Sequence, residues 1–203
     1  MRHSPSPAVT DASVVALSDG EDARLRGEVA KLRRENRALS IALAEMERVA
    51  ERDMLTPLFN RRYFLSALHQ RIARVDRYGD RVVLIYVDVD GLKTINDRFG
   101  HAAGDFALIE LANRLAAGMR TCDVLARIGG DEFGILLEQV GISEARGNLR
   151  RLADAISGEP VQFDGHEIKL SATFGMTMIT PGAAAEELIG RADQDMYRSK
   201  KGG

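Results

Sequence analysis

Two adjacent carboxylates, Asp131 and Glu132, stand on a glycine-rich turn in the second half of the chain. The turn, Gly129-Gly130-Asp131-Glu132-Phe133, joins two apolar runs, 124–128 and 133–137, which predict the strands of an antiparallel hairpin. Glycine permits positive backbone dihedral angles and leaves room for a ligand beside the main chain, while carboxylates are hard oxygen ligands for a divalent cation. The pattern is typical of metal and phosphate chemistry, although Gly-Gly-Asp is also ordinary turn chemistry.

A second acidic pair follows another apolar run. Residues 82–87 read Val-Val-Leu-Ile-Tyr-Val and predict a buried strand, and Asp88 and Asp90 come directly after it. The two carboxylates fall on one side of the strand terminus, which is the usual place for ligands in sheets covered by helices. Two acidic strand ends therefore indicate one site.

The elements that must position these acids alternate between helix and strand. Beyond the runs above, the pattern predicts helices over 58–78, 103–119, 143–157 and 184–200, and a strand near 168–178. This is a mixed α/β (α+β) arrangement with an antiparallel hairpin at its centre.

The N-terminal part of the chain has a different character. Residues 1–20 are rich in Ser, Pro and Ala without periodicity and predict a disordered arm. Residues 21–52 predict a long coiled-coil helix, because apolar positions alternate spacings of four and three over about four heptads. The seam positions are Leu25, Val29, Leu32, Asn36, Leu39, Leu43, Met46 and Ala50.

The coil favours a parallel homodimer. A buried amide at Asn36 costs stability but fixes register in a two-stranded coil, and Glu28 and Arg33 suit an interchain ion pair. The alternative is one amphipathic helix packed on its own domain. Because charged residues leave only a narrow apolar stripe, the pattern favours the dimer.

Composition excludes several classes of protein. The 203 residues are 45% hydrophobic, enough for one sizeable core, and the formal net charge of −2 argues against a general nucleic-acid binder. The single Cys122 allows no internal disulfide, and no apolar stretch is long enough for a signal peptide or a membrane span. We therefore expect a cytoplasmic protein.

Residues from about Asp53 to Lys200 resemble the GGDEF domain of diguanylate cyclases, so we assign 53–203 to such a domain. Four blocks carry the resemblance in family order: Asp53-Met-Leu-Thr-Pro-Leu-Phe-Asn-Arg-Arg62, Asp88-Val-Asp-Gly-Leu-Lys-Thr-Ile-Asn-Asp97, Phe99-Gly-His101 with Gly104-Asp105, and the unchanged signature at 129–133. The resemblance implies a ferredoxin-like core, similar to that of class III nucleotidyl cyclases.

Carried over to this chain, the resemblance implies that Asp88, the carbonyl of Val89 and Asp131 hold Mg²⁺ or Mn²⁺ against the phosphates of GTP, with Glu132 completing the centre. Either Asp131 or Glu132 is then the base that takes the proton of the attacking 3′-hydroxyl, with activation by the metal as an open alternative.

The same resemblance implies the substrate contacts. Asn96 and Asp105 match the positions that bind guanine, although without the family each would be interpreted as a helix cap. Gly91, Leu92 and Lys93 match phosphate contacts, Lys200 matches a phosphate-binding lysine, and Gly129 and Gly130 leave room for the nucleotide.

Two departures from the family pattern stand out. Pro57 and the segment Ala172-Thr-Phe-Gly175 differ from the commonest family residues, and we expect consequences for folding only, because neither is expected to touch the acids. The family usually continues past the lysine to Gly-Arg-Asn, whereas this chain stops at Gly203, so we expect one cationic phosphate contact fewer.

A second cluster indicates feedback control. Arg120-Thr-Cys-Asp123 matches the family's Arg-x-x-Asp site for the product, cyclic di-GMP, since arginine clamps phosphate and Asp123 can accept from a base edge. Arg74 and Arg151 match supplementary arginines for that ligand. The alternative for the tetrapeptide is a surface ion pair, and for the two arginines simple solvation.

The resemblance implies that the chain condenses two GTP into cyclic di-GMP and two pyrophosphates, with product inhibition. Each domain binds one GTP, so two domains must face each other, and a coil supplies the second domain at high effective concentration. The rivals are a module that binds cyclic di-GMP or GTP without catalysis, and a coiled-coil adaptor. No sensor domain precedes the coil, so we expect control through an upstream regulatory protein, the N-terminal arm or the register of the coil.

Overall fold

The computed structural model describes residues 11–202, with side chains omitted for parts of the first helix. Contacts divide the chain into two compact units, residues 1–50 and residues 51–203. The acids, the substrate motifs and the Arg-x-x-Asp cluster all belong to the second unit.

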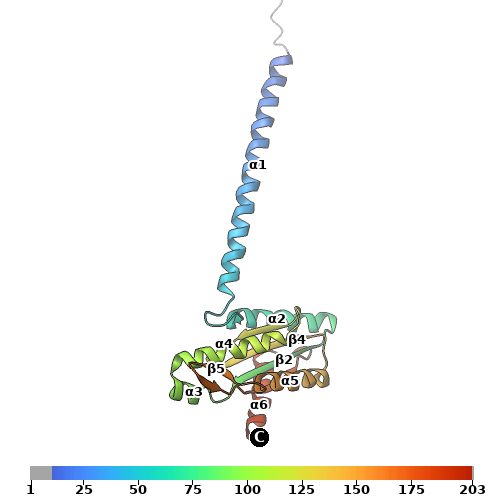
Figure 1. Ribbon diagram of the computed structural model, residues 1–203. Helices are drawn as coiled ribbons and strands as arrows, with labels where there is room; N and C mark the ends of the chain where they lie inside the picture. The colour runs from blue at the N-terminus through green and yellow to red at the C-terminus, as the bar shows by residue number, and fades with distance from the viewer. Residues whose placement is uncertain (1–10, 203) are drawn as a thin grey trace, which may run out of the picture. The chain divides into compact units, whose positions relative to one another are not determined.

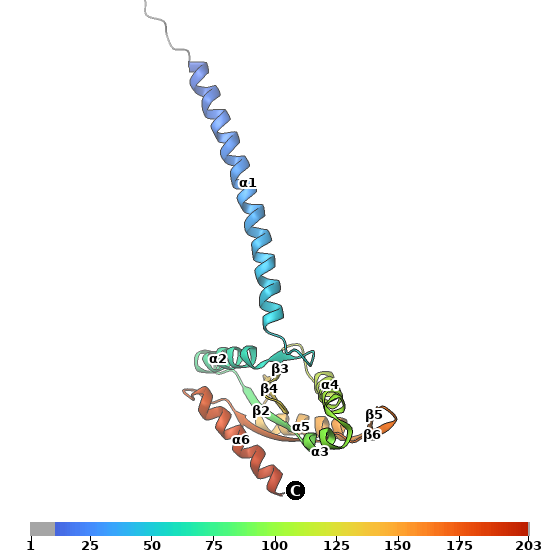
Figure 2. The ribbon, with the colours of Figure 1, turned by 90° about the vertical axis from the view of Figure 1, so that its left-hand side faces the viewer.

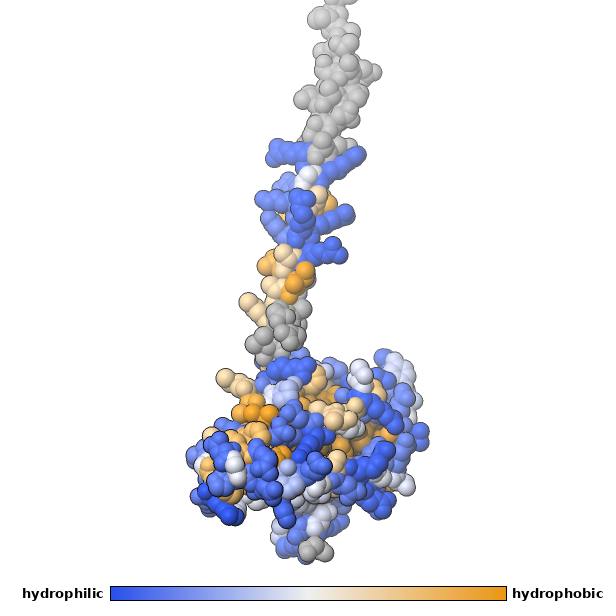
Figure 3. All heavy atoms as spheres, viewed as in Figure 1, coloured by the Kyte–Doolittle hydropathy of each residue, from blue (hydrophilic) through white to orange (hydrophobic). Residues whose placement is uncertain are grey.

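The first unit contains one long helix, α1 (Asp11–Ala50). The side chains described along it are exposed, among them the seam residues Leu25, at 53%, and Leu39, at 71%. Figure 3 shows both apolar and charged side chains exposed along the described part of this helix. Such a stripe remains available for a second helix.

The predicted boundary between arm and coil is wrong, because α1 begins at Asp11 rather than near residue 21. The last prolines before the coil are Pro5 and Pro7, and none occurs from Asp11 to Ala50, so nothing in the backbone chemistry stops helix propagation through 11–20. The rest of the predicted arm, residues 1–10, lies outside the described residues.

Within the described residues of the second unit, five strands form a sheet in the order β1-β3-β4-β2-β7. They are β1 (Phe59–Asn60), β2 (Val82–Val89), β3 (Val124–Arg127), β4 (Glu132–Glu138) and β7 (Ala172–Met178). Only β1 pairs in parallel, with β3, and the other pairs are antiparallel. The predicted hairpin, β3-β4, therefore lies at the middle of the sheet.

Helices cover both faces of this sheet. Figures 1 and 2 show α3 (Leu92–Phe99), α4 (His101–Ala117) and α5 (Ile142–Ser157) on one face, and α2 (Arg61–Tyr78) and α6 (Ala185–Gly202) on the other. The mixed α/β fold predicted from the sequence is confirmed.

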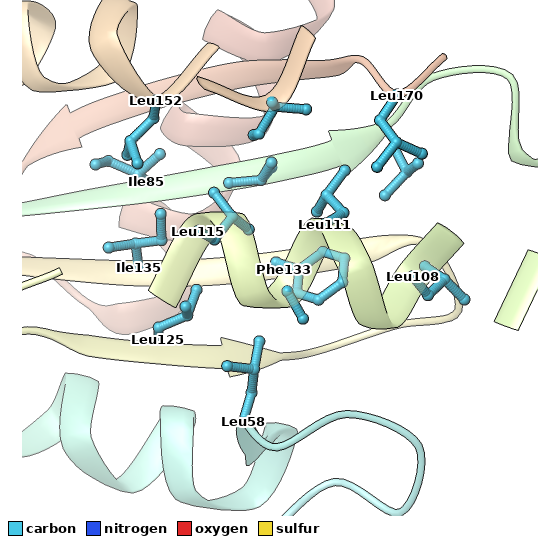
Figure 4. Close-up of a cluster of buried hydrophobic side chains, with 14 of the residues drawn as sticks. Leu58, Ile85, Leu108, Leu111, Leu115, Leu125, Phe133, Ile135, Leu152 and Leu170 are labelled. Carbon is cyan, nitrogen blue, oxygen red and sulfur yellow. The ribbon is translucent and has the colours of Figure 1, made fainter. Parts of the chain in front are cut away.

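Strand alternation divides the core into two layers. Along β2, Val83, Ile85 and Val87 pack toward α4 and α5, whereas Val82, Leu84 and Tyr86 pack toward α2 and α6. Figure 4 shows the first layer, where Leu111 and Leu115 of α4 lie over Phe133 and Ile135 of β4. Asp88 continues the even-numbered series and so belongs to the face of α2 and α6.

Three boundaries differ from the sequence prediction. Helix α2 begins at Arg61 rather than residue 58, because Asn60 caps it by accepting from the backbone N–H of Tyr63. Helix α4 begins at His101, directly after Gly100, whose φ of 86° ends α3. The strand expected over 168–178 is two strands, β6 (His166–Ile168), which pairs with β5 (Val161–Phe163), and β7.

Among the helices of the described residues, none has a stretch of sufficient length and apolarity to cross a membrane.

Candidate active site

Asp88 and Glu132 lie directly opposite each other on neighbouring strands. They are paired residues in the antiparallel register of β2 and β4, so their side chains emerge on the same face of the sheet. Asp131 precedes Glu132, and its carbonyl accepts from the N–H of Val89 at 2.9 Å. The two acidic strand ends therefore lie side by side in the sheet.

A lysine from the last helix reaches this acidic centre. The Nζ of Lys200 lies 2.5 Å from Oδ1 of Asp88. Burial lowers the pKa of Lys200, but the hydrogen bond and charge of Asp88, with the charges of Asp90 and Asp131, raise it by more, so the net shift is upward. The three carboxylates thus create a negative field in which a cation is favoured.

The donor set suits a hard divalent cation. In the part of the chain that the structure describes, no three Asp, Glu, His or Cys side chains gather closely enough to hold a metal by themselves. The groups that act on Lys200 are nevertheless the carboxylates of Asp88, Asp90 and Asp131, and carboxylate oxygens completed by water and phosphate are the ligand chemistry that Mg²⁺ prefers. The negative charges that attract the ammonium of Lys200 would also attract such an ion.

Gly129 makes room for the carboxylate of Glu132. A Cβ on Gly129 would lie 2.3 Å from Oε2 of Glu132, so any side chain at this position would displace the acid. Neither Gly129 nor Gly130 uses the positive φ that glycine permits. Space at Gly129, rather than backbone freedom, is what the hairpin requires there.

Arg127 fastens the hairpin and was missed from the sequence. Its Nη2 donates to the carbonyl of Gly130 at 2.7 Å, and its Nη1 lies 3.3 Å from Oδ1 of Asp53. The Nε of Arg127 is buried without a partner. The only signal for this role was that Asp53 opens a recognised motif, whereas Arg127 belongs to none of the quoted blocks.

Asp53 is the ion-pair partner of Arg127. Its Oδ1 accepts from the N–H and the hydroxyl of Thr56, each at 2.8 Å. Burial raises the pKa of Asp53, but these hydrogen bonds and the Arg127 guanidinium lower it by more, so the net shift is downward. The carboxylate form of Asp53 therefore holds the opening turn to the signature hairpin.

The predicted guanine-binding residues come together on α3 and α4. Both lie inside their helices, so the helix-cap interpretation of Asn96 and Asp105 is wrong. A Cβ on Gly104 would lie 2.0 Å from Oδ1 of Asn96, which means that the Asn96 side chain rests on the backbone beside Asp105. Gly104 is thus the contact point between the two.

The predicted phosphate contacts begin α3. Gly91 precedes the helix with a φ of 69°, a left-handed conformation that favours glycine, and Leu92 and Lys93 form its first turn. Asp90, immediately before this turn, is held by β7, since the hydroxyl of Thr173 donates to its Oδ1 at 2.8 Å. The expectation that segment 172–175 does not touch the acids is wrong, because Thr173 and Asp88 are also register partners.

The Arg-x-x-Asp cluster forms a small pocket with α5. Asp123 accepts from the N–H of Arg120 at 2.9 Å and from the N–H of Glu138 at 3.2 Å. Arg151 lines the same pocket as Arg120 and Asp123. Arg74 does not line it and instead pairs with Asp80, with Nη2 2.7 Å from Oδ2.

Fold and site together define an α/β domain with an acidic centre at the ends of its two central strands. The family model for the diguanylate cyclase GGDEF domain matches residues 50–203. The chain therefore belongs to the GGDEF-domain family.

Named relatives agree with this assignment. Over 88% of its length the chain is 36% identical to diguanylate cyclase DgcP of Pseudomonas aeruginosa, of which it covers 27%. Over 79% it is 37% identical to the probable diguanylate cyclase DgcE of Escherichia coli, of which it covers 15%. The chain thus spans only a minor part of these relatives.

Two solved structures are similar over most of the chain. The diguanylate cyclase SiaD of Pseudomonas aeruginosa, solved with its activator SiaC, has a TM-score of 0.79 and 30% identity, covering 95% of this chain and 75% of SiaD. The coiled coil and GGDEF domain of DgcB from Caulobacter crescentus, solved with c-di-GMP, has a TM-score of 0.77 and 26% identity, covering 90% of this chain and 95% of that one.

Proposed function

We propose that the chain is a diguanylate cyclase that condenses two molecules of GTP into cyclic di-GMP and releases two pyrophosphates. The observation that carries this proposal is the pairing of Asp88 and Glu132 across β2 and β4, with Lys200 on Asp88. A field strong enough to hold a lysine ammonium is also suited to a metal-bound triphosphate. Membership of the GGDEF family supports the same activity.

In this proposal each site residue has a chemical task. Asp88, Asp131, Glu132 and the carbonyl of Val89 would hold Mg²⁺ or Mn²⁺, which would neutralise phosphate charge and polarise the α-phosphate. The free backbone N–H groups at the start of α3, with Lys93, contact the phosphates.

Different residues bind the guanine and accept the proton of the reacting hydroxyl. Asn96 and Asp105 hydrogen-bond to the guanine, and Asp105 accepts from its N1 and N2 donors. Asp131 or Glu132 accepts the proton of the 3′-hydroxyl. The hydroxyl oxygen then bonds to the α-phosphorus of the other GTP, and the bond from that phosphorus to pyrophosphate breaks. Two such steps close the ring.

The reaction requires two copies of the domain, and we assign their pairing to a parallel coil of α1. Its described apolar side chains are exposed, and the similar DgcB fragment was solved with its coiled coil. In sedimentation, Leu32→Glu and Leu39→Glu should produce monomers with little turnover. Ile41→Glu, at an exposed position off the seam, should leave the dimer intact, and equal behaviour of the three variants would contradict this assignment.

The proposal also includes inhibition by the product and control by a partner protein. We assign product inhibition to Arg120, Asp123 and Arg151, which line one pocket. Arg74 pairs with Asp80 and would have to leave this partner to contact the same ligand. SiaD was solved with an activator protein, and we expect an upstream protein partner for this chain as well. A cytoplasmic location follows if GTP is the substrate.

The test is direct. Purified dimer incubated with Mg²⁺ and GTP should yield cyclic di-GMP, identified by mass spectrometry, and the isosteric Glu132→Gln should reduce turnover at least about 100-fold, as expected for loss of a metal ligand or base. Glu144→Gln, on the exposed first turn of α5, is the matched control. Binding of cyclic di-GMP without turnover would instead favour a catalytically silent signalling module.

A further inference from the structure

The last turn of α6 carries Lys200 beyond the buried part of that helix. Met196 is the last buried side chain of α6, and the described side chains from Tyr197 to Lys201 are all exposed. The helix ends at Gly202, so Lys200 also lies where helical hydrogen bonds run out and helices fray. Burial against the sheet therefore does not by itself fix the turn that places Lys200 on Asp88.

One hydrogen bond ties α6 to the sheet close to this turn. The carboxylate of Asp195 accepts from the backbone N–H of Met176 at 2.9 Å. Within the described residues, β7 pairs only with β2 and is an edge strand. The N–H of Ile179 donates to the carbonyl of Val82, and because donors alternate along a strand, the N–H of Met176 points away from β2. Asp195 thus takes the place of a neighbouring strand.

The contribution of Asp195 to its own helix is small. Aspartate is a weak helix former, because its short polar side chain competes for nearby backbone groups. Asp195 nevertheless lies in the interior of α6, and its carboxylate bonds to a strand distant in sequence. A hydrogen bond to an ionised group is about twice as strong as a neutral one. Its main effect is therefore on where α6 lies.

The direction of Lys200 is sensitive to rotation of α6. Asp195 and Lys200 are five residues apart, which is about 140° around the helix axis and about 7.5 Å along it. A side-chain atom about 6 Å from that axis moves by about 1 Å when the helix turns by about 10°. Such a shift weakens a contact like that of the Lys200 ammonium with Asp88, which spans 2.5 Å. A hydrogen bond on another side of the helix resists this rotation.

We propose that Asp195 is a positioning residue for Lys200. By holding α6 on the N–H of Met176, it sets the rotation of the helix and directs the lysine ammonium toward the acidic centre and the phosphates of a bound nucleotide. Asp195 acts through the helix and not through contact with the ligand. The identity of the ligand rests on the proposed function, whereas the tie between α6 and β7 does not.

Nucleotide binding tests this role. The ligand is 3′-deoxy-GTP with Mg²⁺, which lacks the hydroxyl that condenses and so binds without turnover. In isothermal titration calorimetry, Asp195→Ala should weaken its binding about fivefold, because the ammonium loses its direction. Asp195→Asn keeps an acceptor oxygen for Met176 and should recover most of the affinity. Gln194→Ala, at the exposed neighbouring position of the same helix, is the control and should bind like the native chain.

A double variant separates this role from a general loss of stability. If Asp195 acts through Lys200, then Asp195→Ala should have no further effect on affinity in a chain that already carries Lys200→Met. The same loss of about fivefold in both backgrounds would overturn the proposal. An Asp195→Ala chain that binds like the native one would overturn it as well.

A measurement without ligand keeps the two proposals apart. Hydrogen exchange of the amides of residues 197–202, measured by mass spectrometry, should be faster in Asp195→Ala than in the native chain and Gln194→Ala. Unchanged exchange would contradict the positioning role whatever the nucleotide affinity. A native chain that does not bind 3′-deoxy-GTP would contradict the proposed function instead, and the exchange rates alone would then decide whether Asp195 fixes the end of α6.

Discussion

The ammonium of Lys200 lies 2.5 Å from Oδ1 of Asp88, which joins the last helix of the domain to the end of its central strand. The pair is partly exposed, with 39% of the lysine side chain and 18% of the aspartate side chain accessible. Such a pair contributes only about 0–1 kcal/mol to stability. We therefore expect Lys200 to matter for ligand binding, with its ammonium exchanging Asp88 for phosphate.

Replacement of Lys200 should weaken nucleotide binding far more than folding. We expect Lys200→Met to raise the KM for GTP about tenfold, equivalent to about 1.4 kcal/mol, with a small change in Tm. Initial rates over a range of GTP concentrations measure it. Lys201→Met is the control, because Lys201 lies over the ring of Tyr197. Equal KM values for the two variants would contradict a role of Lys200 at the phosphates.

Gly104→Ala should relax base selectivity. The added Cβ would lie 2.0 Å from Oδ1 of Asn96 and force that side chain away from its place beside Asp105. We expect kcat/KM for GTP to fall about tenfold or more, whereas the much lower value for ATP changes little, because lost base hydrogen bonds affect only the correct nucleotide. Gly147→Ala, where a Cβ meets nothing within 4 Å, should leave both values unchanged.

Thr173 should act as a positioning residue for Asp90. Loss of a hydrogen bond to a charged group costs about 1.5 kcal/mol, so Thr173→Val should lower kcat/KM for GTP about tenfold. Thr173→Ser keeps the hydroxyl and should restore most of the activity, a rescue that a purely packing role would not give. Thr177→Val, farther along β7 and opposite Leu84, serves as the control. Equal losses in the Ser and Val variants would exclude this role.

The stability contributed by Asp53 should depend on pH. Its pKa is lowered in the folded state, so the folded chain binds fewer protons than the unfolded chain. The contribution is therefore complete above the ordinary aspartate pKa, about 3.9, and is lost as pH falls through the lowered pKa. Asp53→Asn keeps an acceptor for Thr56 but removes the charge that faces Arg127, and should cost about 1 kcal/mol at pH 7.

Urea unfolding between pH 7 and pH 3 measures this dependence. The difference between the native chain and Asp53→Asn should narrow below about pH 4. A difference that stays constant over this range would show that the charge of Asp53 is not involved. Asp154→Asn, at an exposed position of α5, should match the native chain throughout.

Those strands and site residues that follow from a local residue pattern or a motif could be predicted from the sequence. Alternation and turn residues located β2 and the hairpin, and the motif blocks brought Asp88 and Glu132, which are distant in sequence, into one site. Helix ends were less accurate, since the beginning of α2 depends on the cap at Asn60 and the end of α3 on the conformation of Gly100.

Contacts between distant segments could not be predicted. The hydrogen bond of Thr173 to Asp90 and the ion pair of Arg127 with Asp53 depend on strand register and side-chain direction, neither of which leaves a periodic signal. The sequence also does not show whether a glycine is required for its backbone conformation or for the space beside it. Gly91 is required for its left-handed backbone, whereas Gly129 and Gly104 provide space for a neighbouring side chain.

Gly175 illustrates how far from the acids such space can matter. A Cβ there would lie 2.1 Å from the carbonyl oxygen of Ala192 and 2.3 Å from the N of Met196, so α6 lies directly on the backbone of β7. Met196 is one helical turn before Lys200, and a helix forced outward carries its lysine with it. A random mutagenesis screen for poor GTP affinity would thus be expected to recover changes at position 175, a residue buried beneath a helix and without any ligand contact of its own.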